Sequence, residues 1–551
     1  MSENHIPAKT LGKWLWNNSK GAKGQAVANT FIGLTDVVCQ LLWVLACKHA
    51  IDIATGEAEG SLTLTGIAIG ALMLVEILSR IASRWIHSVT GNKIRNKLRL
   101  SIFSRLMKCD WLHLYKRHTG DLVNRLEGDV SNITSLITES VPATIVVFVQ
   151  LIASFALLFC MSPELAVSVI IILPICLVMS RLYVRKMRRY NRDVRNSDSH
   201  IQSVIQESLQ HKEVIKTMEQ NATTEERIGD LQDTLQRQIT GRTVFSLGSF
   251  TLIQLGFAAG YLLAFLWGVC GLRDGIITYG TMAAYLQLVG LIQRPTMDLS
   301  RYIPGMASSL TAAERLYELE EIPLEEQGDS IILKETAGVR FNDVTFAYSS
   351  EGRRIIDKFS YDFPPGSRTA IVGETGAGKT TLIRLLIALI KPDSGNIELY
   401  NDKELEPATT LTRGNIVYIP QGNSLISGTI RENLLMGNPD ATEDDMKEAL
   451  HTACADYVFE LPNGLDSPIT ESGGGVSEGQ AQRIAVARAI LRSGSILIFD
   501  EVTSALDEET EQEMLQRLAD EKHGKTLIFV THRPAVIKHC TQVLEIKRSK
   551  A

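Results

Sequence analysis

The chain has 551 residues, which is long enough for several domains. Its hydrophobic content of 45% is an average over two unlike parts, because residues 1–310 carry long apolar runs and the remainder has the composition of a soluble α/β protein. The net charge of -6 argues against a general nucleic-acid binder. The cysteines include no C-x-x-C pair, which argues against a zinc site or a disulfide framework and favours buried free thiols.

The first part begins with one amphipathic stretch and continues with apolar ones. Residues 13–16, Lys-Trp-Leu-Trp, predict a short helix on the membrane surface, since Trp side chains prefer the headgroup region. Each apolar stretch can cross a ~30 Å hydrocarbon layer as a helix that rises ~1.5 Å per residue. We predict six membrane spans, and buried helices of a soluble protein are the weaker alternative. The stretches are residues 27–48, 62–86, 139–161, 164–184, 243–270 and 275–304.

Charge predicts the orientation of these spans. The connection between the first two spans is acidic, with Asp52, Glu57 and Glu59, whereas basic residues follow the second span and surround the end of the fourth. The positive-inside rule therefore places both termini and the two long loops in the cytosol. The basic residues are Lys93, Arg95, Lys97, Arg99, Arg181, Arg185, Lys186, Arg188, Arg189, Arg192 and Arg195.

Both cytosolic loops are expected to be helical extensions of the spans. In the first loop, Leu98, Ile102 and Leu106 recur at helical spacing between basic residues. The helices are predicted to break near residues 110–120 and 217–224, which would then lie farthest from the bilayer. These two tips are the natural places to contact a cytosolic motor, and solvated helical hairpins without a partner are the alternative.

Two acidic residues fall inside predicted spans. Asp36 is in the first span and Glu76 in the second, at similar depth from the cytosolic ends. A charge at this depth is costly and normally faces a partner or a watery cavity. Structural pairing is the favoured interpretation, because Arg80 follows Glu76 at i+4. The alternative is that both acids line a cavity for a cationic or amphipathic substrate.

The second part of the chain is organised around a phosphate-binding loop. Residues 371–381 read Ile-Val-Gly-Glu-Thr-Gly-Ala-Gly-Lys-Thr-Thr and match G-x-x-x-x-G-K-[ST]. Glycines let the backbone approach a phosphate, and successive N–H groups at a helix start form an anion site. Lys379 would reach the β- and γ-phosphates, and the Thr380 hydroxyl would ligate Mg²⁺. A predicted strand at 369–372 and a predicted helix at 382–386 favour this over a chance Gly-rich turn.

Two later apolar strands end in polar residues. Residues 496–501 end in Asp500, which would hold Mg²⁺, and Glu501, which would orient the attacking water. Residues 525–532 end at His532, which would reach the γ-phosphate because ligand groups gather beyond the carboxyl ends of strands. The alternatives are a strand that ends at the surface and a structural histidine. Upstream of the loop, Tyr348 can stack on adenine, although an aromatic there is more often an ordinary strand residue.

The gap between Lys379 and Asp500 exceeds what one strand-helix-strand unit needs, so we predict an inserted helical subdomain at about 425–490. Within it, Ser477 opens a helix that runs through Ile490. The Ser hydroxyl, the Gly479 backbone and the helix N-terminus could form a second anion-binding site, and an ordinary Ser-capped helix is the alternative. Such a site would bind the phosphate held by another copy.

Taken together, these motifs resemble an ABC exporter half-transporter of the six-helix type found among bacterial multidrug, lipid and peptide exporters. The resemblance covers essentially the whole chain. It implies an all-α transmembrane domain at 1–320, a linker at 321–336 and a cytosolic α/β P-loop ATPase domain with the helical insertion at 337–551. The ATP-binding residues that it implies are Tyr348, Gly373, Glu374, Thr375, Gly376, Ala377, Gly378, Lys379, Thr380, Thr381 and Gln421.

The resemblance also assigns roles outside the loop. Glu501 takes the catalytic-base position and His532 the switch position, and Mg²⁺ would be held by Thr380, Gln421 and Asp500. Asp507 matches the D-loop at 504–507, and residues 470–473 resemble the X-loop, which touches the long cytosolic loops. Residues 312–316 look like the usual exit from the sixth helix.

One motif departs from the family pattern. The usual signature is L-S-G-G-Q, and this chain has Val476, Ser477, Glu478, Gly479 and Gln480. The Ser and the second Gly are kept, and the carboxylate of Glu478 in the first helical turn is favourable to the helix dipole. We interpret it as a tolerated variant in a homodimer. A heterodimer with a second half-transporter is the alternative, because some heterodimeric exporters carry an altered signature on the complete chain.

The implied function is ATP-driven export of a hydrophobic or amphipathic drug, lipid or peptide across the cytoplasmic (inner) membrane. Two chains would sandwich each ATP between the Walker A loop of one and the signature helix of the other, and alternating access would follow. The resemblance implies ATP and Mg²⁺ as cofactors and a lipid bilayer, but no nucleic acid, as a partner. An ATP-gated channel or regulator is the alternative, disfavoured by Glu501 and His532. A soluble repair or translation ATPase is disfavoured by the spans.

Overall fold

The computed structural model describes residues 7–18, 23–349, 352–470, 475–503, 505–520 and 524–547. Residues 471–473 of the predicted X-loop and Ser504 of the predicted D-loop lie outside the described residues. The chain divides into two compact units. The first comprises Met1–Ile102 and Val123–Glu318, and the second comprises Phe103–Leu122 and Leu319–Ala551.

The first unit is built from long helices, and they contain the predicted spans except residues 275–278, which precede α11. Two π-helical segments, η1 (Arg125–Asp129) and η2 (Leu136–Ser140), join α5, α6 and α7 into one run. α3, α5 and α11 each contain a boundary between the units. The helices are α1 (Ala8–Asn18), α2 (Lys23–Thr55), α3 (Leu62–Leu106), α5 (Thr119–Asn124), α6 (Val130–Ser135), α7 (Val141–Met161), α8 (Pro163–Gln210), α9 (Lys212–Thr217), α10 (Asn221–Arg273) and α11 (Tyr279–Glu320).

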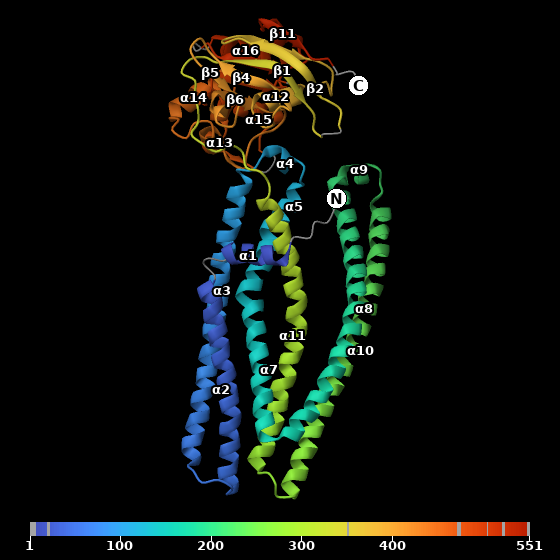
Figure 1. Ribbon diagram of the computed structural model, residues 1–551. Coiled ribbons are helices and arrows are strands. Elements are labelled where there is room, and N and C mark those ends of the chain that lie inside the picture. Colours follow the sequence, from blue (N-terminus) through green and yellow to red (C-terminus); the bar gives the residue numbers. More distant parts are fainter. Residues whose placement is uncertain are drawn as a thin grey trace. The chain divides into compact units, whose positions relative to one another are not determined.

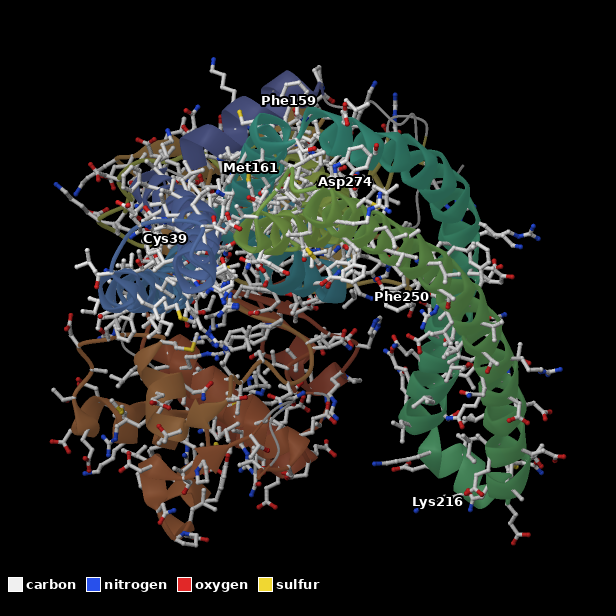
Figure 2. The ribbon with its side chains drawn as sticks, turned by 90° about the horizontal axis from the view of Figure 1, so that it is seen from below. Cys39, Phe159, Met161, Lys216, Phe250 and Asp274 are labelled. Carbon is white, nitrogen blue, oxygen red and sulfur yellow. The ribbon has the colours of Figure 1, made fainter. Side chains whose placement is uncertain are left out.

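Four helical segments of the described chain are long and apolar enough to cross a membrane. They are Lys23–Thr55, Leu62–Leu106, Thr119–Met161 and Asn221–Arg273. Of the other two predicted spans, 164–184 lies in α8, and 275–304 lies in α11 from Tyr279 onward. α8 and α10 run side by side and are joined by α9 (Figure 1). Figure 2 shows this pair from below, with Lys216 of α9 at one tip and Asp274 at the opposite end of α10. The predicted break near 217–224 is therefore confirmed.

The first helix differs in one respect from its prediction. α1 forms, but the Trp14 side chain is only 6% exposed and meets Tyr317 of α11 edge-on, with ring centroids 6.3 Å apart. This face of the amphipathic helix is therefore buried against protein rather than at a lipid surface. The predicted exit from the sixth helix, 312–316, lies within α11, where Ala312, Ala313 and Leu316 are buried.

The spanning part of the first unit packs around a small apolar core. Tyr285 and Leu288 of α11 are at its centre, with Leu158 of α7 and Leu165 of α8 beside them. By contrast, many apolar side chains of α3 and α10 are exposed, including Leu64, Ile67, Trp85, Leu255 and Leu262. Exposed apolar surface of this extent is what a lipid-facing helix requires.

The second unit contains two larger sheets and a helical insertion. A parallel sheet has the order β11-β3-β10-β9-β6, and an antiparallel sheet has the order β2-β1-β4-β5. The strands are β1 (Gly338–Phe346), β2 (Ile356–Phe363), β3 (Arg368–Val372), β4 (Ser394–Tyr400), β5 (Leu405–Pro407), β6 (Ile416–Ile419), β7 (Gly428–Thr429), β8 (Pro468–Ile469), β9 (Ile496–Asp500), β10 (Thr526–Val530) and β11 (Gln542–Glu545). The helices are α4 (Trp111–Tyr115), α12 (Lys379–Leu386), α13 (Ile430–Leu435), α14 (Glu443–Thr452), α15 (Glu478–Ile490), α16 (Glu508–Asp520) and α17 (Pro534–Lys538), with 3-10 turns η3 (Thr412–Asn415), η4 (Asp456–Glu460) and η5 (Gly464–Asp466).

The central strands of the parallel sheet are buried on both faces. Along β9, Leu497 and Phe499 point into a core formed with the insertion helices, whereas Ile496 and Ile498 point into a core formed with α12 and the antiparallel sheet. A strand covered on both sides reads as a continuous apolar run, which is why the sequence predicts these strands well. The insertion predicted at 425–490 is confirmed, since α13, α14 and α15 lie in it.

Residues 103–122 belong to the second unit rather than to the helical one. Their backbone pairs with the segment after α11: Asp110 N donates to Pro323 O at 2.9 Å, and Glu325 N donates to Lys108 O at 2.9 Å. Arg413 of η3 donates two 3.1 Å hydrogen bonds to Glu325 and fixes that segment to the second unit. The prediction that the tip near 110–120 contacts the motor is therefore confirmed within this unit.

Candidate functional site

The phosphate loop lies where β3 ends and α12 begins. Its glycines Gly373, Gly376 and Gly378 have φ values of 153°, 81° and 106°, a region that other residues rarely adopt. A Cβ on Gly373 would also collide with the carbonyl oxygen of Ile546. Gly378 is the N-cap of α12, so the first amides of that helix face the loop. The backbone therefore forms the anion cradle that the motif predicts.

The Lys379 ammonium lies inside this cradle. Its Nζ donates to Gly373 O at 2.5 Å and contacts His532 Nε2 at 2.8 Å. Because an ammonium only donates, His532 Nε2 is the acceptor in this contact. The parallel register explains the meeting of two residues so far apart in sequence, since Val530 of β10 pairs with Ile371 of β3.

The acidic pair lies at the same edge of the sheet. Asp500 is 6% exposed and accepts a 3.0 Å hydrogen bond from the Tyr418 hydroxyl at its Oδ2. Burial raises the pKa of Asp500, and the hydrogen bond from Tyr418 opposes that rise. A carboxylate oxygen is the kind of ligand that Mg²⁺ prefers.

Glu501 has an unusual backbone for a residue with a side chain. Its φ is 51°, and its N–H donates to Val530 O at 2.9 Å. The Gln421 amide donates to its carboxylate at 2.7 Å, and His532 Nε2 lies 3.9 Å from it. Backbone strain of this kind costs about 1–3 kcal/mol and persists where surrounding contacts impose it. Here it turns the carboxylate toward Gln421 and His532.

Tyr348 lies beside the helix that follows the loop. Its hydroxyl is 3.4 Å from Thr381 Oγ1 and accepts a 3.0 Å hydrogen bond from Arg384. The ring packs edge-on against Phe346, with centroids 5.0 Å apart. The structure thus brings Tyr348 to the start of the helix that follows the loop. The loop residues Glu374, Thr375, Gly376 and Thr380 are exposed, whereas Ala377 and Thr381 are buried.

The signature residues form a separate group at the start of α15. Ser477 caps the helix reciprocally with Gln480: Gln480 N donates to Ser477 Oγ at 3.2 Å, and Ser477 N donates to Gln480 Oε1 at 2.9 Å. Glu478 is exposed at the first helical position. A Cβ on Gly479 would lie 2.7 Å from Ala505 O, so the helix packs closely on the chain before α16.

Asp507 caps the next helix and completes this group. It accepts hydrogen bonds from Thr510 N at 2.9 Å and Thr510 Oγ1 at 2.8 Å. Among the described residues, no hydrogen bond joins Ser477, Gly479 or Asp507 to the loop residues, to Gln421 or to Glu501. Within one chain the predicted site residues therefore form two groups.

The two intramembrane acids share one cation. Arg80 forms a close ion pair with Glu76, and its Nε lies 3.8 Å from Asp36 Oδ1. Gln40 donates to Asp36 at 3.1 Å and in turn accepts from Gln150 at 3.1 Å. The predicted structural pairing is confirmed, and both acids also line cavities. One, of about 340 Å³, includes Asp36 and Arg80, and the other, of about 310 Å³, includes Glu76 and Arg80.

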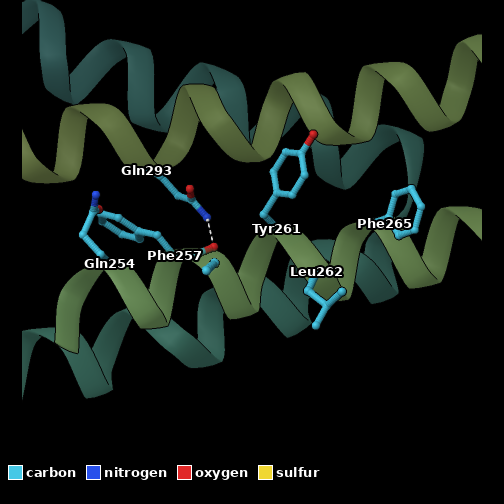
Figure 3. Close-up of a pocket in the computed structure, with 7 residues that line it drawn as sticks. Gln254, Phe257, Tyr261, Leu262, Phe265 and Gln293 are labelled. Atoms are coloured by element: carbon cyan, nitrogen blue, oxygen red, sulfur yellow. Dashed lines mark hydrogen bonds between the residues drawn. The ribbon is translucent and has the colours of Figure 1, made fainter. Parts of the chain in front are cut away.

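A third cavity of about 530 Å³ lies between α10 and α11 (Figure 3). The Gln293 amide of α11 donates to Phe257 O of α10 at 2.9 Å and links the two helices. The lining has no charged side chain. It consists of Gln254, Phe257, Ala258, Tyr261, Leu262, Phe265 and Gln293. The sequence did not indicate this cavity, because the apolar pattern of a span conceals which face it presents.

A family model described as "ABC transporter transmembrane region" matches residues 27–296, and one described as "ABC transporter" matches residues 356–504. The chain belongs to the ABC exporters. It is 26% identical over 551 residues to the uncharacterized ABC transporter ATP-binding protein YfiC of Bacillus subtilis, covering 97% of this chain and 89% of that protein. It is 29% identical over 458 residues to an ATP-dependent lipid A-core flippase of Pseudomonas fluorescens, covering 82% and 76%.

The fold of the exporter is also that of a solved structure. A bacterial Atm1-family ABC exporter with ATP bound aligns with a TM-score of 0.79 and 22% identity, over 96% of this chain and 94% of that chain. The exporter is thus a membrane protein with a helical transmembrane region and a nucleotide-binding ATPase region that powers transport.

Sequence reasoning missed three side chains that the fold brings to the exporter's ATPase centre. The Tyr418 hydroxyl donates a hydrogen bond to Asp500, and the Arg384 guanidinium donates one to Tyr348. Arg533, next to His532, donates to Leu506 O at 3.0 Å and pairs with the buried Glu511 at 3.2 Å. Tyr418 could have been found from the sequence, because it lies in the strand that ends just before Gln421. No motif marks the two arginines.

Proposed function

We propose that two copies of the exporter bind ATP and Mg²⁺ at paired sites and move an amphipathic substrate outward by alternating access. The observation that carries the proposal is the convergence of Lys379, Gln421, Glu501 and His532 at one sheet edge, beside a loop whose glycines leave room for phosphates. We assign the membrane domain to 1–320, the linker to 321–336 and the ATPase domain to 337–551.

The residues at this edge fit the chemistry of hydrolysis. Lys379 would hold the β- and γ-phosphates, and Thr380, Gln421 and Asp500 would hold Mg²⁺, which when bound offsets phosphate charge. Glu501 would accept a proton from the attacking water, with the Gln421 amide fixing its carboxylate. Tyr348 would stack on the adenine.

Two copies are proposed because one chain separates the residues into two groups. Ser477, Gly479 and Gln480 open a helix whose N-terminus suits an anion, and none bonds to the loop of its own chain among the described residues. A second copy would bring its signature helix to that loop. A homodimer is the simpler assembly, since Glu501 and His532 are both present.

The substrate is proposed to be a drug, a lipid or a peptide with apolar and polar parts. The cavity between α10 and α11 offers Phe257, Tyr261 and Phe265 for the apolar part and two amides for polar groups. Asp36 and Glu76 share Arg80, which leaves negative charge for a cationic group. The named lipid A-core flippases act on an amphipathic lipid and support this class. We place the exporter in the cytoplasmic membrane with both termini cytosolic, from the distribution of basic residues.

The test uses the purified chain in lipid nanodiscs. We expect Mg²⁺-dependent ATP hydrolysis that Glu501→Gln abolishes, and stimulation by the cationic amphiphile rhodamine 6G or by a short-chain fluorescent lipid. Folded protein that binds ATP but hydrolyses none would overturn the homodimer and indicate a second half-transporter. Hydrolysis that survives Glu501→Gln would overturn the role of Glu501.

A further inference from the structure

Arg384 joins the proposed adenine platform to the tip of the first cytosolic extension. It lies on α12, one helical turn beyond the phosphate loop, and its Nη1 donates to the Tyr348 hydroxyl at 3.0 Å. The same guanidinium lies over two aromatic rings of α4, 4.8 Å from the centroid of Trp111 and 5.0 Å from that of Tyr115. One side chain therefore contacts the platform and α4 at once.

The aromatic side of this contact is preorganised. Trp111 and Tyr115 are one turn apart on α4 and stack on each other, with centroids 4.6 Å apart and an interplanar angle of 23°. The side chain of Asp110 caps the helix by accepting from His113 N at 3.2 Å. The Arg384 guanidinium lies within the roughly 6 Å range of cation–π attraction from the centroids of both rings.

α4 does not depend on Arg384 for its attachment. Its preceding residues pair with the chain after α11 through Asp110 N to Pro323 O and Glu325 N to Lys108 O, each 2.9 Å. Leu112 packs against the core that contains α12. Loss of Arg384 should therefore leave α4 docked while removing one specific link.

The orientation of the Tyr348 ring depends on Arg384 more directly than the docking of α4 does. Among the described residues, the Tyr348 ring packs on the core around α12 and on the edge of Phe346, and two polar groups reach its hydroxyl: that of Thr381 at 3.4 Å and the Arg384 guanidinium at 3.0 Å. The contact with Thr381 is at the long limit for a hydrogen bond, so Arg384 supplies the main polar constraint on the ring.

We propose that Arg384 is a positioning residue that orients Tyr348 for adenine and transmits occupancy of the base site to α4. This rests on the proposed function, in which Tyr348 stacks on adenine. A base against the Tyr348 ring would restrict the hydroxyl that Arg384 binds. The guanidinium would then hold Trp111 and Tyr115 more firmly, so that the membrane helices on either side of α4 sense bound nucleotide.

The test separates the base from the phosphates. In nanodiscs, on a Glu501→Gln background that prevents turnover, binding of Mg·ATP is compared with binding of inorganic tripolyphosphate, which has no base. We expect Arg384→Gln to weaken ATP binding about fivefold, the size of one lost hydrogen bond, and to leave tripolyphosphate binding unchanged. Tyr348→Phe should give the same loss, and the double variant should be no worse than either single one.

The tripolyphosphate arm also controls for charge. Burial raises the pKa of Asp500 and the Arg384 charge opposes that rise, so a variant could act through Asp500 instead. In that case both ligands would weaken together, and the positioning role would be wrong. Arg384→Lys should restore part of the ATP affinity, since an ammonium can still donate to Tyr348.

The proposed link from Arg384 to α4 is tested by measuring amide hydrogen exchange in residues 107–118. We expect ATP to slow exchange there in the parent protein, and Arg384→Gln or Trp111→Leu to remove that effect. Trp111→Leu should lower the affinity for ATP less than Arg384→Gln does, because the hydrogen bond from Arg384 to Tyr348 remains. Unchanged protection in both variants would overturn the link to α4. If the parent protein bound neither ATP nor tripolyphosphate, the proposed function itself would fail instead.

Discussion

The Gln421 side-chain amide donates a 2.7 Å hydrogen bond to the Glu501 carboxylate. Gln421 follows β6 and Glu501 follows β9, and these strands are neighbours in parallel register, with Ile419 opposite Phe499. The bond therefore fixes the carboxylate from the side of the sheet that leads into the helical insertion. Movement of Gln421 would release the Glu501 carboxylate. A displacement of the adjoining helical insertion could therefore change the position of the proposed catalytic base.

Replacement of Glu501 by Gln should remove hydrolysis and keep nucleotide binding. The amide cannot take a proton from water, so the rate should fall about 10²–10⁴-fold, the usual contribution of a general base. Steady-state phosphate release and ATP binding would be measured on the same preparation. Glu509→Gln in the first turn of α16 is the matched control and should keep full activity. Equal turnover in both variants would remove Glu501 from the mechanism.

Replacement of Lys379 by Ala should weaken binding of both ATP and tripolyphosphate. The Lys379 ammonium is already inside the cradle, within reach of Gly373 O and His532. Its charge-assisted bonds are worth about 1.5–3 kcal/mol, so affinity should fall at least tenfold. Equilibrium binding would be measured with each ligand. Loss of ATP binding alone would contradict a role at the phosphates.

Replacement of Gly479 by Ala tests how closely α15 packs. The new Cβ would lie 2.7 Å from Ala505 O, a backbone atom that cannot turn aside. We expect a large fall in ATPase activity with a smaller fall in melting temperature. Gly229→Ala on α10 is the control, since a Cβ there meets nothing within 4 Å and Ala favours a helix by about 0.5–1 kcal/mol. Normal turnover in Gly479→Ala would show that this packing is dispensable.

Replacement of Arg80 by Gln should destabilise the membrane helices. Asp36 and Glu76 would lose the cation that they share, and an uncompensated acid at this depth costs about 3 kcal/mol. The melting temperature in detergent should fall. Adding Asp36→Asn and Glu76→Gln should restore it, because no charge then needs a partner. If the triple variant were as unstable as the single one, loss of packing rather than of charge would be responsible.

The thiol of Cys540 should resist alkylation in the folded protein. Burial raises its pKa to about 11, and its Sγ donates to Val536 O at 3.3 Å. At pH 8 almost none of it is therefore the reactive thiolate. Mass spectrometry of maleimide-treated protein should show Cys540 unlabelled until the ATPase domain unfolds. Rapid labelling of the native protein at pH 8 would show that the thiol is accessible and ionised.

Much of the fold could be predicted because its elements have strong periodic or continuous apolar patterns. β9 and β10 are buried on both faces and read as unbroken apolar runs, and the long helices are interrupted near the expected positions. The surroundings of α1 were harder to predict. Its amphipathic pattern shows which face is apolar, but the pattern is the same whether lipid or Tyr317 covers Trp14.

The sequence by itself determined the phosphate loop, the strand-end acids and the capped signature helix, because each depends on a few adjacent residues whose chemistry is local. Tertiary structure alone decided that Tyr418 bonds Asp500, that Lys379 meets His532 and that Arg384 bridges Tyr348 to α4. These contacts join residues tens to hundreds of positions apart, and strand register and helix docking set their distances. Those distances cannot be predicted from any local pattern in the amino-acid sequence.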